Sequence, residues 1–367
     1  MTTPCLEHQS KSFAWNAASF KTSADYSLGL TDDERAELVA AVRALPDPTT
    51  PQTTGPAQFA LERLSPRLKA AYDEVRSGRG FVVLRGLPVD DLSKDEFVAA
   101  VWGVGTHFGT ALSQNTSGDL IGHVVDATAE DATPRMYRSN LELRPHNDIT
   151  AMISLACWHK SETGGASVIV SAVTVHDALC RHHPEVLAPL YRGFHYHQVG
   201  EEASGEPPVT RQRVPLFAVR NGQLSSRYLR SNLVAGHRAL DMPLTDEEIA
   251  ALNMFDAVAT APENRLAFFL ERGDMIVINN YTVMHARTSF KNYPEPERKR
   301  HLVRLWMDRP DFRDIPPEYI FHEVNGVPRR EGKSATLNFR KLYADDPVAS
   351  GGVADLKVTD EMAAGRG

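Results

Sequence analysis

The sequence predicts a mainly β protein with flanking helices, built around a double-stranded β-helix, or jelly-roll, barrel. Short runs of apolar and β-forming residues recur after about residue 105, and turns rich in glycine, proline and asparagine separate most of them. Neither a strand followed by GxGxxG nor a GxxxxGKS/T loop occurs, which removes the common nucleotide-binding folds. Many short strands with long connections are typical of a double-sheet barrel with helices packed outside.

The first 79 residues are expected to form an arm and helices that pack on the barrel. Residues 1–30 are polar and weakly patterned, which indicates an extended arm. A capping box from Thr31 to Glu34 then begins a helix that Pro46 ends. Further along we expect, in order, a helix over 58–76, a strand over 81–84, a helix from 93, strands over 120–125, 151–156 and 168–173, a helix over 174–180, a strand over 216–219, a helix over 245–255, and strands over 266–270, 275–278 and 301–307.

The rest of the chain is divided at one further boundary. A single barrel domain with helical insertions is expected over 80–344, because β-rich runs continue through most of that range. The segment 345–367 is rich in small and polar residues, so we expect it to be a mobile tail.

Charge and composition limit the partners of this chain. It has 40 Lys and Arg against 47 Asp and Glu, a net charge of −7, so a surface that binds nucleic acid is not expected. No apolar run approaches the roughly 18–20 residues of a membrane-spanning helix. The 3 cysteines cannot close a disulfide framework, so the cytoplasm is the expected compartment. With 14 histidines, any bound metal would have nitrogen and oxygen ligands.

The first candidate site is the pair His146-x-Asp148. On a strand or tight turn, residues i and i+2 point the same way, so the imidazole and the carboxylate can bind one ion together. The pair precedes an apolar run over 149–156, and functional residues often lie where such a strand begins. The spacing alone is weak evidence, because His183 and Glu185 repeat it around a proline, where a solvated helix start explains it.

The second candidate combines His285 with the strand expected at 301–307. A lone histidine after a buried strand is more often a core residue with a satisfied hydrogen bond, and this alternative stays open. On the returning strand, however, Arg300, Arg304 and Trp306 share one face by alternation. Buried guanidinium groups need anionic partners, and a carboxylate matches their fork shape. We therefore favour an internal anion site beside His285 over an exposed face with solvated arginines.

Two other segments contain residue types that could take part in a site. Ser167 follows a glycine-rich turn, where its hydroxyl could donate to a carboxylate held by an arginine; a turn without function is the alternative. His195 and His197 form a His-x-His pair, which on a strand would be a competing metal site. No third ligand of obvious context lies near that pair in the sequence.

In combination, these segments resemble the Fe(II)/2-oxoglutarate-dependent dioxygenases, above all the taurine dioxygenase-like (TauD/TfdA) group. The resemblance extends from about Gly80 to Arg309, and its ordered combination is more specific than any one piece. Besides His146-x-Asp148, it includes 109–115, Gly164–Gly165–Ala166–Ser167, Gly273–Asp274, His285–Ala286–Arg287–Thr288 and 297–304.

The resemblance implies a role for each candidate. His146, Asp148 and His285 would hold Fe(II), with 2-oxoglutarate and O2 as co-substrates. Two imidazoles and one carboxylate leave such an ion positively charged, with three adjacent open positions. Arg300 would pair with the distal carboxylate of 2-oxoglutarate, and Ser167 would offer its hydroxyl to the same group.

The resemblance says less about the prime substrate. Arg304 matches a position that in relatives often binds an anionic group of the substrate. Gln114, Asn115, Tyr137 and Asn140 could line the mouth of the barrel, although ordinary loop polarity explains each of them at least as well.

The expected activity is hydroxylation of a C–H bond in a small molecule that carries a carboxylate, such as an amino acid, with release of succinate and CO2. Desaturation or cyclisation by the same centre is an alternative. A non-catalytic barrel that binds a small acid, or a metal through His195 and His197, is another. We expect no nucleic acid or membrane partner, and a homo-oligomer, dimer or tetramer, is possible.

Overall fold

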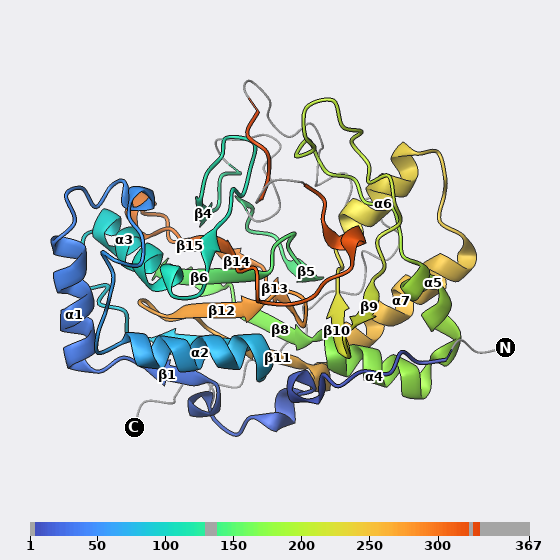
Figure 1. Ribbon diagram of the computed structural model, residues 1–367, viewed down its shortest axis with the longest axis horizontal. Helices are drawn as coiled ribbons and strands as arrows, with labels where there is room; N and C mark the ends of the chain where they lie inside the picture. The colour runs from blue at the N-terminus through green and yellow to red at the C-terminus, as the bar shows by residue number, and fades with distance from the viewer. Residues whose placement is uncertain (1–3, 129–137, 323–325, 331–367) are drawn as a thin grey trace.

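The computed structural model describes residues 4–128, 138–322 and 326–330, and its strands form two larger sheets and two ribbons (Figure 1). The main sheet has the order β1 (Ser27–Gly29), β2 (Phe81–Arg85), β12 (Met275–Asn279), β6 (Met152–His159), β15 (His301–Asp308), β3 (Thr110–Ala111), and β4 (Ile121–Val125) also pairs with β15. The second sheet has the order β11 (Arg265–Phe268), β8 (Ser167–Ser171), β13 (Val283–Arg287), β5 (Leu143–His146). The ribbons pair β9 (Phe217–Arg220) with β10 (Gln223–Ser226), and β7 (Thr163–Gly164) with β14 (Phe290–Lys291).

The two larger sheets enclose one apolar core. Phe81 and Ile276 of the main sheet share a buried cluster with Ile169 and Val283 of the second sheet. Because side chains alternate along a strand, Val277 points the other way and joins the cluster that the main sheet forms with the helices. This arrangement confirms the predicted mainly β, jelly-roll core. The described strands do not close into a full barrel, because the two sheets keep separate hydrogen-bond ladders.

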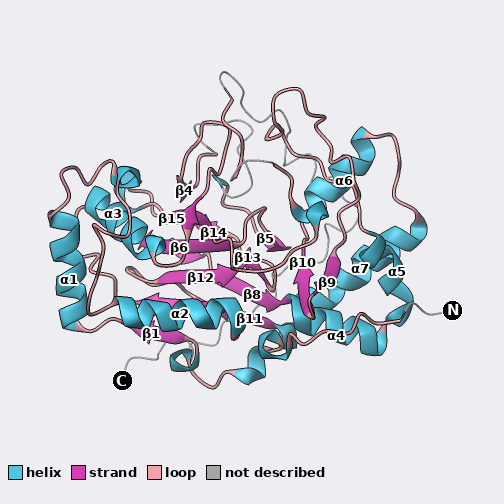
Figure 2. Cartoon of the chain, viewed as in Figure 1, coloured by secondary structure: helices cyan, strands magenta, loops and turns pink. Residues whose placement is uncertain are grey.

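Helices surround this core (Figure 2). They are α1 (Asp32–Arg43), α2 (Ser65–Ser77), α3 (Lys94–Thr106), α4 (Ala172–His182), α5 (Leu187–Arg192), α6 (Arg230–Ala239) and α7 (Asp246–Thr260). In Figure 1, α2 crosses in front of the main sheet, α1 and α3 lie at the left end, and α4 to α7 gather at the right. In the described part of the chain, no helix combines the length and the hydropathy needed to cross a membrane.

The capping boxes were the most reliable helix signals in the sequence. Thr31, Ser93 and Thr245 each accept a hydrogen bond from the backbone N–H three residues on, and begin α1, α3 and α7. The helix expected from residue 58 begins only at Ser65, where Pro66 occupies the first turn. The arm also contributes a strand, because β1 pairs in parallel with β2.

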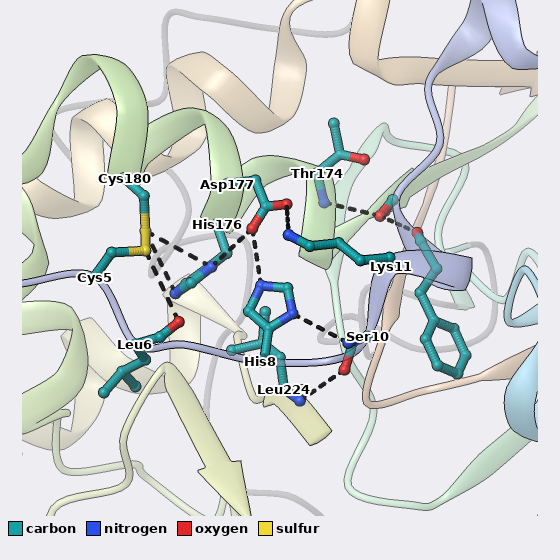
Figure 3. Close-up of polar contacts among 12 residues, drawn as sticks. Cys5, Leu6, His8, Ser10, Lys11, Thr174, His176, Asp177, Cys180 and Leu224 are labelled. Atoms are coloured by element: carbon teal, nitrogen blue, oxygen red, sulfur yellow. Dashed lines mark hydrogen bonds and ion pairs between the residues drawn. A yellow bond between two sulfur atoms is a disulfide. The ribbon is translucent and has the colours of Figure 1, made fainter. Parts of the chain in front are cut away.

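A disulfide ties the N-terminal arm to α4. Cys5 is bonded to Cys180, 175 positions further along the chain (Figure 3). Cys157 is buried and free. The cysteine count predicted no disulfide framework, and the structure pairs two of the three cysteines in one bond. Nothing local in the sequence could show it, because the two cysteines meet only through the fold.

Asp177 is the centre of the polar contacts beside this disulfide (Figure 3). Its carboxylate accepts hydrogen bonds from His8 Nε2 at 2.8 Å, His176 Nδ1 at 3.3 Å and Lys11 Nζ at 3.1 Å. His8 Nδ1 accepts from the Ser10 N–H, which leaves Nε2 as the donor. Burial alone would raise the pKa of Asp177, but these hydrogen bonds lower it well below its usual range. The arm is therefore held to α4 by a charged network as well as by the disulfide.

Candidate active site

The fold brings His146, Asp148 and His285 together at one end of the second sheet. His146 ends β5 and His285 lies in β13, where the two histidines are direct partners in the antiparallel register. Their ring centroids are 4.2 Å apart. One ligand atom from each of the three residues lies within 4.8 Å of the others. Strand pairing thus places His285 beside two candidate ligands that are two positions apart in the sequence.

The turn that carries the candidate ligands His146 and Asp148 is fixed through Asn147, which is fully buried between them. Its side-chain Oδ1 accepts from the Tyr228 N–H at 3.1 Å and from Ser226 Oγ at 3.3 Å. Its Nδ2 donates to the Val283 carbonyl at 3.3 Å. The amide therefore joins the ligand turn to β13 and to the chain around β10. Sequence reasoning saw no role for this residue.

Asp148 is oriented by two groups from β15. Trp306 Nε1 donates to Oδ2 at 2.8 Å, and Arg304 Nη1 lies 3.4 Å from the same oxygen. The other oxygen, Oδ1, lies 3.7 Å from His146 Nε2. Burial alone would raise the pKa of Asp148, but the Arg304 guanidinium and then the two imidazoles hold it below its usual value. The carboxylate is therefore ionised.

Each imidazole can offer a ring nitrogen to a metal ion. His146 Nδ1 donates to the Arg144 carbonyl at 2.8 Å, which leaves the lone pair of Nε2 available. Burial lowers the pKa of His285 to about 3, so its ring stays neutral at ordinary pH, and its buried Nδ1 has no hydrogen-bond partner in the structure. Two neutral imidazoles and one carboxylate are the donor set that suits a non-haem iron with open positions.

Arg300 lies in the same cavity as the three ligands, together with Ser167. Its side chain is only 5% exposed, and burial lowers its pKa to about 10, so it remains a cation. Within the described residues, no acidic side chain forms an ion pair with its guanidinium. A buried charge without a counter-ion destabilises the folded protein, and binding of an anion would offset this penalty. The residues present thus fit a dicarboxylate that reaches from the metal ligands to Arg300.

Other residues that line the cavity come mostly from segments that the sequence did not single out. Glu201 lies in the long loop before β9, and Ser231 and Asn232 lie in the first turn of α6. Arg287, two residues after His285, also lines the cavity. No local motif marks Glu201, Ser231 or Asn232, because these positions reach the cavity only through the tertiary fold, whereas Arg287 belongs to the segment 285–288 that the family resemblance includes.

The remaining predicted residues are placed as follows. Gln114 is buried and accepts from Arg304 Nε at 2.7 Å, so its side chain holds that arginine. Asn115 lies in a turn, where its amide donates to Asp119 at 2.8 Å. The Asn140 carbonyl accepts from the backbone of the β14 ribbon. Neither Asn115 nor Asn140 lines the cavity of the three ligands. Tyr137 lies outside the described residues.

In the described part of the chain, His195 and His197 do not form a metal site with a third ligand. His195 Nδ1 is bonded to the Thr210 carbonyl, and His197 Nδ1 accepts from the Val199 N–H. Neither joins a described group of three metal-binding side chains. The two histidines instead organise the loop before β9.

Comparison with known proteins gives concordant matches. A family model described as "Taurine catabolism dioxygenase TauD, TfdA family" matches residues 41–306. FR-33289 synthase of Streptomyces rubellomurinus (strain ATCC 31215) is 30% identical over 315 residues, which cover 84% of this chain and 92% of that protein. The taurine hydroxylase-like protein SAT17 of Stachybotrys chartarum (strain CBS 109288 / IBT 7711) is 26% identical over 306 residues, 80% of this chain and 77% of that one.

Two solved structures share the fold. One is an asparagine oxygenase in complex with Fe(II), 2S,3S-3-hydroxyasparagine and succinate, with a TM-score of 0.60 at 17% identity. The other is the non-heme iron oxygenase OrfP in complex with Fe, succinate and (3S)-hydroxy-L-Arg, with a TM-score of 0.58 at 14% identity. Each match covers 77% of this chain and 93% of the other. At these identities the likeness concerns the fold.

Proposed function

Since this chain belongs to the taurine catabolism dioxygenase TauD, TfdA family, and is accordingly an Fe(II)- and 2-oxoglutarate-dependent dioxygenase, we propose that it hydroxylates a C–H bond of a small metabolite. The metabolite would carry a carboxylate, as an amino acid or its derivative does. In this proposal His146, Asp148 and His285 hold the iron. The observation that carries it is the convergence of these three ligands and the unpaired cation of Arg300 on one cavity.

Bound iron with 2-oxoglutarate and O2 would supply the oxidising power; one oxygen atom of O2 would enter succinate, formed with CO2 from 2-oxoglutarate, and the other would go to the substrate. The chain itself binds, orients and excludes water. Arg300 would take the distal carboxylate of the co-substrate, with Ser167 as an additional donor. Apolar side chains such as Ile153 and Leu302 line the same cavity and limit the entry of water.

The substrate class rests mainly on Arg304. Its guanidinium lies in the cavity beside Asp148, where its positive charge would attract a substrate carboxylate. Glu201 also lines this cavity and adds a carboxylate to its polar lining. The related folds crystallised with hydroxylated asparagine and arginine are compatible with a substrate of this kind.

Anaerobic addition of Fe(II) and 2-oxoglutarate tests the iron site. We expect a weak visible charge-transfer band that is lost in His146→Ala and kept in His195→Ala. A band that survives in the first variant and disappears in the second would refute the assignment. Release of succinate should then be measured against a panel of small acids and their uncharged amides or esters. Equal turnover of both sets would refute the carboxylate requirement.

Domain organisation, compartment and oligomeric state remain predictions. We propose one catalytic domain over 80–344 on which residues 1–79 pack, supported by the pairing of β1 with β2. The cytoplasm is still the proposed compartment, although disulfides such as Cys5–Cys180 are rare in reducing compartments. Alkylation of free thiols in intact cells before lysis would show whether Cys5 and Cys180 are reduced, as expected in the cytoplasm, or bonded to each other, as expected in an oxidising compartment. Sedimentation would show whether the chain forms the proposed dimer or tetramer.

A further inference from the structure

The two β15 groups that hold Asp148 differ in chemistry. Arg304 and Trp306 are two positions apart, share one face of the strand, and both approach Asp148 Oδ2. The guanidinium of Arg304 stacks over the Trp306 ring, with 5.0 Å from its carbon to the ring centroid. A guanidinium can exchange one carboxylate for another, whereas an indole N–H is a single, uncharged, directed donor.

This difference matters when a substrate arrives. In the proposed function, Arg304 binds the substrate carboxylate, so it is shared between that group and Asp148. Trp306 has no such second task, because its 2.8 Å hydrogen bond to Oδ2 uses its one donor. The indole is 4% exposed and is fixed in the core between the two sheets. Its hydrogen bond therefore persists whichever partner Arg304 takes.

We propose that Trp306 is a positioning residue that keeps Asp148 a one-oxygen ligand of the metal. The indole N–H occupies Oδ2, so Oδ1, the oxygen that faces His146, is the one left for the ion. A carboxylate that bound through both oxygens would take an additional coordination position that the co-substrate or O2 needs. The inference rests on the assignment of His146, Asp148 and His285 to iron.

The test measures metal binding without turnover. Trp306→Phe keeps most of the apolar ring and removes the donor. We expect Fe(II), titrated anaerobically into the metal-free protein without substrate, to bind about 10–100-fold more weakly, as is typical when an outer partner of a ligand is lost. We also expect the charge-transfer band of the 2-oxoglutarate complex to weaken or shift.

A matched control is available in the same chain. Trp15 Nε1 donates to the Arg79 carbonyl at 2.8 Å, in a buried aromatic cluster. Trp15→Phe should leave the affinity for Fe(II) unchanged. If Trp306→Phe folds poorly, replacement of the Trp306 indole by the isosteric benzothiophene removes the N–H while keeping its shape, and the same loss is expected.

Each outcome has a distinct meaning. A wild-type protein that binds no Fe(II) at the triad would refute the proposed function, whatever Trp306 does. If the wild-type protein binds Fe(II) and both Trp306 replacements bind it equally well, the positioning role is wrong. A loss of affinity in both replacements, without a change in Trp15→Phe, supports it.

Discussion

Among the described residues of the candidate site, one buried polar side chain has its hydrogen bonds satisfied and one buried cation has no acidic partner. Asn147 lies between two proposed iron ligands with each side-chain polar atom bonded. Arg300, in contrast, is buried without an acidic partner among the described residues. The first residue contributes to the stability of the metal-free protein, and the second reduces it in favour of binding an anion.

We expect Asn147→Ala to lower the free energy of unfolding by about 2–4 kcal/mol, because the Tyr228 N–H and the Val283 carbonyl are left buried without this partner. Urea denaturation of the metal-free protein measures it. Asn115→Ala, in a turn bonded to Asp119, is the control and should cost under about 1 kcal/mol. Equal losses in the two variants would show that the buried amide has no special role.

Arg300→Met should have opposite effects on stability and on binding. The variant removes an unpaired buried cation while keeping its volume, so the metal-free protein should gain about 1–3 kcal/mol. Its affinity for 2-oxoglutarate should fall at least tenfold, because a charge-assisted hydrogen bond is lost. Thermal unfolding and equilibrium titration measure the two effects. A variant that is less stable and binds 2-oxoglutarate normally would contradict both.

At the scale of elements, α6 is a helix that no local sequence signal predicts. The capping boxes of α1, α3 and α7 are local signals, and the sequence contains them. The helix α6 has no side-chain cap and contains Gly236. It is stabilised by packing on the loop before β9, so no local pattern predicts it, nor the cavity residues Ser231 and Asn232 that it carries.

Gly236 makes this dependence testable. Replacing glycine by alanine inside a helix usually stabilises it by about 1 kcal/mol. Here a Cβ would lie 2.4 Å from the His195 carbonyl oxygen, which is backbone and cannot move freely. We expect Gly236→Ala to lower the free energy of unfolding by about 1–2 kcal/mol and to raise the KM of the substrate. A more stable variant would show that α6 does not pack tightly on this loop.

At the scale of the molecule, the disulfide joins two segments that are far apart in the sequence. It closes a loop across 175 positions, and Cys5 is exposed to reductant. We expect Cys5→Ser to lower the free energy of unfolding by about 2–5 kcal/mol, since the unfolded chain regains the freedom of that loop. Calorimetry with and without dithiothreitol measures it. Reductant should destabilise the wild-type protein and leave Cys5→Ser unchanged; equal sensitivity would contradict this.

The sequence predicted the class of the core and the positions of those strands that are local apolar runs, but not β5 and β13, which are short and contain charged or polar residues. It also placed His146, Asp148, His285 and Arg300 in one hypothesis, which depended on a family resemblance as well as on spacing. Contacts between segments that are far apart in the sequence could not be predicted from local patterns. Gln114 holding Arg304 is one example, and Cys5 bonded to Cys180 is another.

The strand order has a consequence for how the chain is made. In the main sheet, β12 lies between β2 and β6, and in the second sheet β13 lies between β8 and β5. Both inserted strands come from the segment after residue 274. A nascent chain that ends there has neither sheet complete and lacks His285. Neither sheet can therefore be completed until the ribosome has released the segment that follows residue 274, and His285 joins His146 and Asp148 only at that stage.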